Sequence, residues 1–293
     1  MADHVGHPIV MGLSSGPPTV RMQSAIERSD IVKANTTPIR RRPALALIAT
    51  AAALAAIIAG GAAQSGAAPA AKGQRTIKSG AGPGWPKTLH PSDFVRRVDN
   101  PWFPLKPGSK WFYRGIEGKT HESNKVHVKH KRKTILGVHT TIVHDVVFKH
   151  GEPREVTDDW YAQDRRGNVW YFGENTKELD SHGHVISREG SFKAGKNGAR
   201  PGVLFPGHPK RGQTARQEYL KGHAEDHFKI LDVSARVHSP YVSSRHAVRT
   251  KEWTPLEPGI VENKYYVRGV GTVKAKVVKG PRERSQLVHF RRG

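Results

Sequence analysis

The stretch REVTDDWYAQDRRGNVWYFG, residues 154–173, decides the fold that we predict. Its two halves, 154–163 and 168–173, are rich in β-branched and aromatic residues, and a glycine-bearing turn separates them, which is typical of a β-hairpin. Because successive side chains of a strand point to opposite faces, Trp160 and Tyr161 lie on different faces. A hairpin with aromatic side chains on both faces is either buried twice, as in a sandwich, or lines a cavity on one side.

The same pattern of short apolar runs and turn residues continues on both sides of this hairpin. It predicts an all-β domain, an antiparallel meander that forms a sandwich or a curved, partly open barrel. One short N-terminal helix is expected within residues 90–98, with Ser92 as its cap. Residues 191–212, rich in glycine and proline, are expected to form a long ordered loop. The expected strands are 110–115, 119–131, 139–149, 154–163, 168–173, 214–219, 227–237, 246–253, 261–267, 272–278 and 284–290.

The N-terminal region indicates export. Arg40, Arg41 and Arg42 precede an alanine-rich apolar run, and small residues follow it, so residues 40–71 are expected to be a signal peptide or a membrane anchor, with 44–63 as the segment that would span. A buried alanine-rich helix is the alternative. Residues 1–39 are expected to be a disordered or misassigned leader, with Met22 as an alternative start. Residues 72–88 are expected to be a flexible linker, and 89–293 a single all-β domain outside the cytoplasm, secreted or anchored.

Composition limits the chemistry. The chain has no cysteine, which excludes disulfides, thiolate metal sites and a lipidated cysteine. Six of 48 Lys and Arg residues and three of 25 Asp and Glu residues precede residue 72, so the exported part has a formal charge of +20. This charge favours an anionic partner such as a wall polymer or a membrane surface, although basic residues spread along the whole chain also fit a solvated surface. No motif for specific nucleic-acid recognition occurs.

Candidate catalytic residues are the carboxylates Asp159, Glu225, Asp226 and Glu252. A glycan hydrolase needs two carboxyl groups on either side of one bond, whereas adjacent residues of a strand, such as Asp158 and Asp159, face opposite ways. Such a pair would therefore have to form between strands. His223 and His227 are candidate metal ligands, but seventeen histidines produce such spacings by chance. The sequence contains no nucleophile elbow, phosphate-binding loop or dinucleotide fingerprint, so no cofactor is expected.

Aromatic residues are the candidate ligand-binding set. Trp160, Tyr161, Trp170, Trp253 and Tyr265 lie within the expected strands. They fit either an ordinary core or a cradle for an apolar small molecule or lipid.

Several segments also resemble a group of secreted bacterial proteins of undetermined activity, largely from actinobacteria. The residues that carry this resemblance are 99–105 (DNPWFPL), 159–164 (DWYAQD), 167–174 (GNVWYFGE), 252–259 (EWTPLEPG), 264–266 (KYY) and 269–271 (GVG). The last two are loosely similar to a hairpin of extracytoplasmic half-barrel lipoproteins that carry lipids. The resemblance implies a β fold, and this chain departs from it in carrying many His, Lys and Arg residues on its strands.

The function expected from these observations is non-catalytic binding at the cell surface, with an apolar ligand held in an aromatic-lined β cradle. The alternatives are a cell-wall glycan hydrolase that uses paired carboxylates, and adhesion to anionic polymers through the basic surface. The sequence leaves the oligomeric state open.

Overall fold

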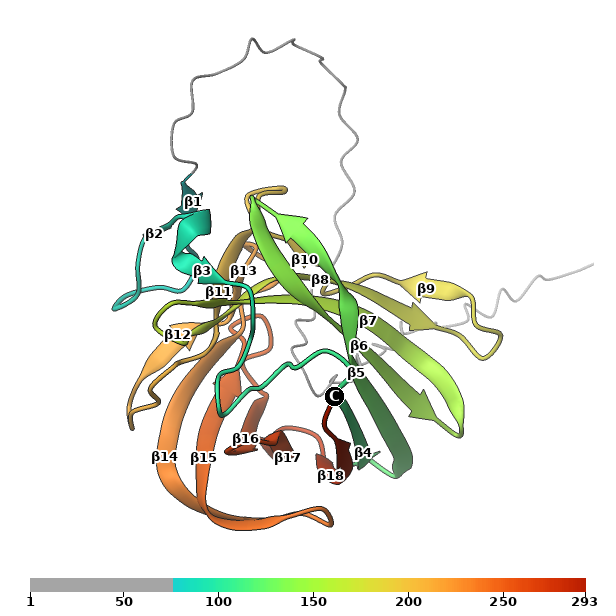
Figure 1. Ribbon diagram of the computed structural model, residues 1–293. Coiled ribbons are helices and arrows are strands. Elements are labelled where there is room, and N and C mark those ends of the chain that lie inside the picture. Colours follow the sequence, from blue (N-terminus) through green and yellow to red (C-terminus); the bar gives the residue numbers. More distant parts are fainter. Residues whose placement is uncertain (1–75) are drawn as a thin grey trace, which may run out of the picture. The chain divides into compact units, whose positions relative to one another are not determined.

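A computed structural model describes residues 76–293, which form an antiparallel β structure (Figure 1). The elements are β1 (Ile77–Lys78), β2 (Thr88–Leu89), η1 (Pro91–Asp93), β3 (Phe94–Val95), β4 (Lys110–Glu117), β5 (Thr120–Ile135), β6 (Val138–Lys149), β7 (Glu152–Asp164), β8 (Val169–Leu179), β9 (Val185–Ser187), β10 (Phe192–Lys193), β11 (Arg200–Phe205), β12 (Thr214–Arg216), β13 (Glu218–Tyr219), β14 (His227–His238), β15 (Ser243–Trp253), β16 (Val261–Val267), β17 (Gly271–Lys279) and β18 (Glu283–Arg291).

The main sheet is a nearly closed barrel. Strands β4 to β8 form one meander and β14 to β18 another, and β18 pairs with β4 to join them. At the two ends of this strand order, β12 pairs with β14 and β13 pairs with β11. A single residue, Gln217, separates β12 from β13, so one continuous segment links the two remaining edges. The all-β prediction is confirmed, and of the two expected architectures the curved barrel is the observed one.

Three segments differ from the sequence prediction. The N-terminal helix is a single 3-10 turn, Pro91–Asp93, and its N-cap is His90 rather than Ser92, because Asp93 accepts a hydrogen bond from the backbone of His90. Strands β10 and β11 lie within the expected loop 191–212, and β11 pairs with β8. Residues 76–88, expected as linker, contain β1, which packs Ile77 into the core.

The aromatic hairpin β7–β8 is buried on both faces. Tyr161 and Tyr171 are cross-strand partners, and their rings stack with centroids 4.8 Å apart on the interior of the barrel. On the outer face, Trp170 meets Trp85 and Phe94 edge-on, with centroids 6.5 and 6.4 Å away. The segment that precedes β4 therefore covers the hairpin from outside, which explains why aromatic residues occupy both faces.

The barrel interior is acidic. Along β7, Glu155, Thr157, Asp159 and Tyr161 alternate with outward-facing residues, and all four are buried. In the described part of the chain eight carboxylates are buried, but Lys264 is the one cationic side chain that joins them. Almost all of the basic residues therefore face solvent, and the outer surface carries a larger positive charge than the composition suggests.

Several sequence predictions concern residues outside the described part. The expected leader 1–39 and the expected signal or anchor 40–71, which includes the spanning segment 44–63, lie outside the described residues. Among residues 76–293, no helix has the length and apolar character needed to cross a membrane.

Candidate functional site

A strap of irregular chain, residues 96–109, lies across one end of the barrel and is fixed mainly by Asn100. This side chain is buried, and its Nδ2 donates to the carbonyls of Gly167 and Pro206 at 2.8 and 3.1 Å. Its Oδ1 accepts from the backbone N–H groups of Trp102 and Phe103. All the hydrogen-bonding groups of the amide are used, so Asn100 makes this part of the strap a rigid corner.

Other parts of the strap are held by backbone hydrogen bonds to the barrel. The N–H of Gly269, in the turn after β16, donates to Pro101 O at 2.7 Å, and the N–H of Gly108 donates to Val128 O at 2.9 Å. In addition, the side-chain Oε1 of Gln163, at the end of β7, accepts hydrogen bonds from the backbone N–H groups of Asp99 and Asn100. The strap is therefore tied to the barrel at three separate places, the turn after β16, the middle of β5 and the end of β7, and the space beneath it is preformed.

A groove of about 540 Å³ lies between the strap and the barrel rim. Its apolar wall includes Val98, Leu105 and Phe290, together with the prolines of the strap. Cavities of roughly 300 to 1,000 Å³ are the usual size for small-molecule sites. The groove is therefore large enough for a ligand, and much of its wall is apolar.

The polar part of the groove is strongly cationic. Arg97, Lys106, Arg132 and Arg292 line it, and Asp99 is the one carboxylate among its lining residues. That carboxylate already accepts a hydrogen bond from Gln163 Nε2 at 2.7 Å.

Two of the guanidinium groups are held in position. Arg132 donates to the carbonyl of Arg96, and Arg292 donates to the carbonyl of Gly269 at 3.1 Å. Each guanidinium has five N–H donors, so further donors remain for a ligand. The groove thus combines an apolar wall with preoriented cations.

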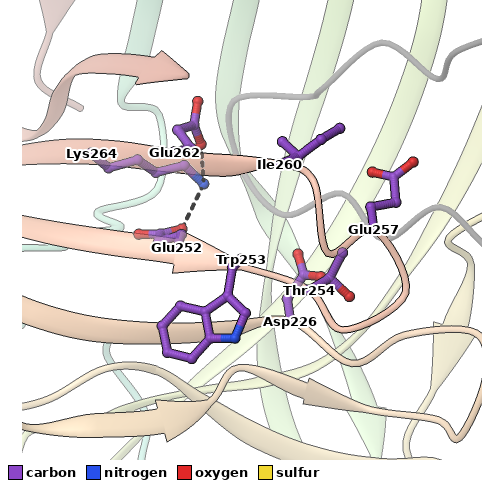
Figure 2. A pocket seen from close by; sticks show the side chains of 8 residues that line it. All are labelled: Asp226, Glu252, Trp253, Thr254, Glu257, Ile260, Glu262 and Lys264. Carbon is purple, nitrogen blue, oxygen red and sulfur yellow. Dashed lines mark ion pairs between the residues drawn. The ribbon is translucent and has the colours of Figure 1, made fainter. Parts of the chain in front are cut away.

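A second, much smaller cavity of about 30 Å³ lies where β15 and β16 meet the chain before β14 (Figure 2). The Lys264 ammonium stands between two carboxylates, 2.9 Å from Glu252 Oε2 and 3.4 Å from Glu262 Oε2. Tyr266 and Thr250 donate their hydroxyls to the other oxygen of Glu252. The cavity has room for about one water molecule.

The ionisation of this cluster follows from burial and charge. Burial alone lowers the pKa of the Lys264 ammonium, but Glu252 and Glu262 outweigh it and hold this pKa well above its ordinary value. Burial raises the pKa of Asp226 to about 8, although Lys264 opposes the shift. Lys264 is thus a permanent cation that stabilises the ionised form of its neighbours, which is typical of a structural ion pair.

The four candidate catalytic residues are separated into three places. Asp226 and Glu252 line the small cavity, where a sugar ring has no room. Asp159 is buried in the interior outside the lining of this cavity and accepts the hydroxyl of Tyr171 at 2.6 Å. Glu225 accepts the N–H of Gly222 at the end of a surface turn. As expected for adjacent strand residues, Asp158 faces outward, toward Lys129 and His144.

The five candidate ligand-binding aromatics do not form one site. Trp160 faces outward beneath the Lys133 ammonium, 3.7 Å from its ring centroid, whereas Tyr161 faces inward. Trp170 is covered by the N-terminal segment, and its Nε1 donates to Asp164 Oδ2. Trp253 stacks on His227 at 5.4 Å. Tyr265 packs against the core on the outer side of β16. None of the five lines the groove.

The two candidate metal ligands, His223 and His227, have different surroundings. His227 Nδ1 is 2.7 Å from the carbonyl oxygen of Glu225, and burial lowers the pKa of this imidazole. His223 lines a separate surface cavity. Across residues 76–293, no three His, Cys, Asp or Glu side chains are arranged to hold a metal ion.

The sequence interpretation missed the groove residues because they come from five separate parts of the chain. One signal for the strap was present in DNPWFP, residues 99–104, which predicts a rigid corner. Nothing in the spacing of Arg97, Arg132 and Arg292 shows that they meet.

The described domain is thus an antiparallel, nearly closed β-barrel with a strapped groove. No family model and no curated protein sequence matches this chain. Three solved structures are similar to it. A candidate exported protein with a YmcC-like fold from Bacteroides fragilis is 12% identical over 65% of this chain and 99% of its own, with a TM-score of 0.38.

The other two similar structures have comparable values. A candidate lipoprotein from Parabacteroides distasonis is 10% identical over 65% of this chain and 98% of its own, with a TM-score of 0.35. A β-barrel-like protein from Brucella abortus, with a domain of unknown function, is 11% identical over 62% of this chain and 96% of its own, with a TM-score of 0.36. TM-scores and identities this low give no basis for transferring a function.

Proposed function

We propose that this protein is an exported, non-catalytic binding protein whose groove holds an amphipathic anion. The observation that carries the proposal is the groove itself, with about 540 Å³ of space, an apolar wall and four cationic side chains. Export is supported by the basic, apolar and small-residue pattern of residues 40–71. The expected aromatic cradle is replaced in this proposal by a wall of proline, valine, leucine and a single phenylalanine.

The chemistry of the groove favours one orientation of the ligand. An acidic headgroup, such as a carboxylate or phosphate, forms charge-assisted hydrogen bonds with Arg132 and Arg292 at the rim. An alkyl chain or ring system covers Phe290 and the partly exposed prolines of the strap and removes their apolar surface from water, at roughly 25 cal/mol per Å². A neutral ligand of the same shape gains the burial of apolar surface but lacks the charge-assisted hydrogen bonds.

A fluorescent long-chain fatty acid and its methyl ester provide the test. We expect the acid to bind the full-length protein with saturation and the ester to bind at least about tenfold more weakly, because it lacks the charge that the arginines recognise. The double variant Arg132→Ala, Arg292→Ala is expected to reduce the difference between acid and ester. Arg114→Ala is the matched control, because Arg114 is exposed on β4 and does not line the groove.

Two results would contradict the proposal. The first is equal binding of the acid to the double variant and to the wild type. The second is equal loss of binding in the Arg114→Ala control, which would indicate attraction to the overall charge. Mass spectrometry of the protein recovered from an exporting host, with lipid extraction in parallel, then identifies the natural ligand.

Adhesion to an anionic polymer is a second candidate, favoured by the outer face of β4 to β6. There the pKa of His127 is lowered, first by burial and then by the positive charges of Lys110, His144, His130 and Lys129. Such a cluster attracts a polyanion. Binding to a long polyphosphate that weakens steeply between about 50 and 200 mM salt is expected for this function, and salt-independent binding would exclude it.

A further inference from the structure

A cavity of about 520 Å³ lies apart from both the groove and the acidic interior. It is formed by the loop before β11 and the turn after β13, and it shares no lining residue with the groove. Its polar lining includes Ser191, Asn197, Arg200, Lys221 and His223. Its size lies within the usual range for sugar-sized and larger small molecules.

Both loops around this cavity are stiffened by their own hydrogen bonds. In the first, Gly195 N–H donates to Ala199 O at 2.9 Å and Ala199 N–H donates to Lys196 O at 2.8 Å. Asn197 at the tip has a φ of +50°, a conformation that asparagine tolerates better than most residues. In the second, Leu220 N–H donates to Ala224 O at 2.7 Å. The cavity is therefore preformed, so less ordering of the chain opposes binding.

Arg200 is the residue that defines the chemistry of this cavity. It is paired across the strands with Tyr219, and its guanidinium lies 5.3 Å from the centre of that ring. The guanidinium of Arg216 lies 4.6 Å from the same ring centre, so Tyr219 supports both groups. The ring restricts Arg200 while the side chain stays exposed, so its N–H donors remain available to a ligand.

The charge of the cavity has a single sign. Arg200 and Lys221 carry positive charge, His223 adds to it when protonated, and the eight lining residues include no carboxylate. Ser191 already donates to the carbonyl of Thr176 and accepts from its N–H, whereas the exposed Asn197 amide offers hydrogen bonds to a ligand. Planar or tetrahedral anions match the guanidinium, and hydroxyl groups match the amide.

We infer that this cavity binds a sugar that carries a phosphate or carboxylate group. The anionic group lies against Arg200 and Lys221, and the hydroxyls of the sugar reach Asn197. The site goes beyond the proposed function, because its ligand is hydrophilic and the groove is not involved.

Isothermal titration calorimetry of the full-length protein with glucose 6-phosphate, glucuronate and glucose tests this inference. We expect at least one of the two anions to bind with a Kd below about 1 mM and glucose to bind far more weakly. The anion that binds more tightly distinguishes a phosphate site from a carboxylate site. Arg200→Ala is expected to weaken binding at least about tenfold, since a hydrogen bond to a charged group is lost.

Arg236→Ala is the matched control, because Arg236 is exposed on β14 and lies outside the cavity lining. Lys221→Ala serves as a second variant if Arg200→Ala does not fold. The inference is overturned if neither anion saturates the protein at millimolar concentration, if both cavity variants bind like the wild type, or if the control weakens binding equally. Fatty-acid binding by Arg200→Ala is expected to be unchanged, so the outcome is independent of the groove.

Discussion

The replacement of Asp145 by asparagine tests whether the acidic interior limits stability at neutral pH. Asp145 on β6 faces the interior and is almost completely buried, and neither carboxylate oxygen has a well-aligned hydrogen-bond partner among the described residues, although the Asn124 amide lies nearby. Burial raises its pKa from 3.8 to about 7, while Asn124 opposes the shift. A carboxyl group whose pKa is raised in the folded state binds its proton more tightly there than in the unfolded chain. Its contribution to stability is therefore complete below pH 3.8 and is lost as pH rises toward 7.

The size of the effect follows from the width of this window. A shift of about three pKa units at 1.36 kcal/mol per unit gives a loss of about 4 kcal/mol between pH 3 and pH 7. An asparagine at this position does not ionise, so the variant escapes this loss. We expect Asp145→Asn to match the wild type within about 1 kcal/mol at pH 3 and to exceed its free energy of unfolding by about 3 kcal/mol at pH 7.

Asp158 provides a matched control on the outer face of β7. Burial opposes its ionisation, but hydrogen bonds from His144 and Lys129 outweigh this and lower its pKa to about 2. A group with a lowered pKa stabilises the fold above its unfolded value, and that stability is lost as pH falls toward 2. Asp158→Asn is therefore expected to destabilise the protein at pH 7, by less than about 1 kcal/mol because the side chain is partly exposed.

Urea unfolding of the wild type and both variants, at pH values from 3 to 8, supplies the measurement. The reasoning is refuted if the wild type gains stability between pH 4 and pH 7, or if Asp145→Asn is the less stable protein at pH 7. Glu122 and Asp226, with pKa values raised by burial to about 7 and about 8, act in the same direction as Asp145. The stability of the wild type is therefore expected to keep falling up to about pH 8.

Three further predictions concern the strap, the ion pair and the sheet closure. Asn100→Ala removes four hydrogen bonds and is expected to lower the free energy of unfolding by about 3 kcal/mol and to weaken fatty-acid binding, as checked by urea unfolding and titration. Lys264→Met leaves the buried carboxylates of Glu252 and Glu262 unpaired and is expected to cost about 3 to 5 kcal/mol at pH 7. The cost is expected to be smaller at low pH, because burial raises the pKa of Glu262 and favours its protonated form, and an equal cost at both pH values contradicts this. Gly202→Ala places a Cβ 2.4 Å from the carbonyl oxygen of Gln217 and is expected to lower Tm sharply, whereas Gly183→Ala, with no neighbour within 4 Å, is expected to have a smaller effect that reflects its positive φ alone.

The strand pattern was predictable because it depends on local chemistry. Alternation of side chains, β-branched content and turn glycines identify the hairpin β7–β8 and its neighbours without any knowledge of distant contacts. The same local rule placed Asp158 and Asp159 on opposite faces, as the structure has them. Alternation cannot show which face becomes the interior when a sheet closes, so the polar row Glu155, Thr157 and Asp159 gave no sign that it is buried.

Strand β11 was missed because glycine and proline are read as loop residues. In this strand, however, Gly202 is required by packing, since the carbonyl oxygens of Arg216 and Gln217 lie where its side chain would be. The same reasoning applies to residues 76–88, where Gly80 lies against the Cβ of Tyr219. In the sequence, a strand whose small residues permit close backbone approach looks the same as a flexible linker. Only a contact with a distant part of the chain distinguishes the packed strand from the linker.

The segregation of charge explains why a ligand is expected at the rim and not within the barrel. Eight carboxylates are buried in the described part of the chain, where Lys264 is the one buried cation, and burial raises the pKa of Asp145 to about 7, so this group ionises as pH rises past neutrality. An anionic group that entered would meet like charge in a medium of low dielectric constant, where repulsion is strong. At the rim, Arg97, Lys106, Arg132 and Arg292 offer the opposite sign next to an apolar wall. The acidic interior therefore excludes the headgroup, while the strap supplies the one large apolar surface that lies beside these cations.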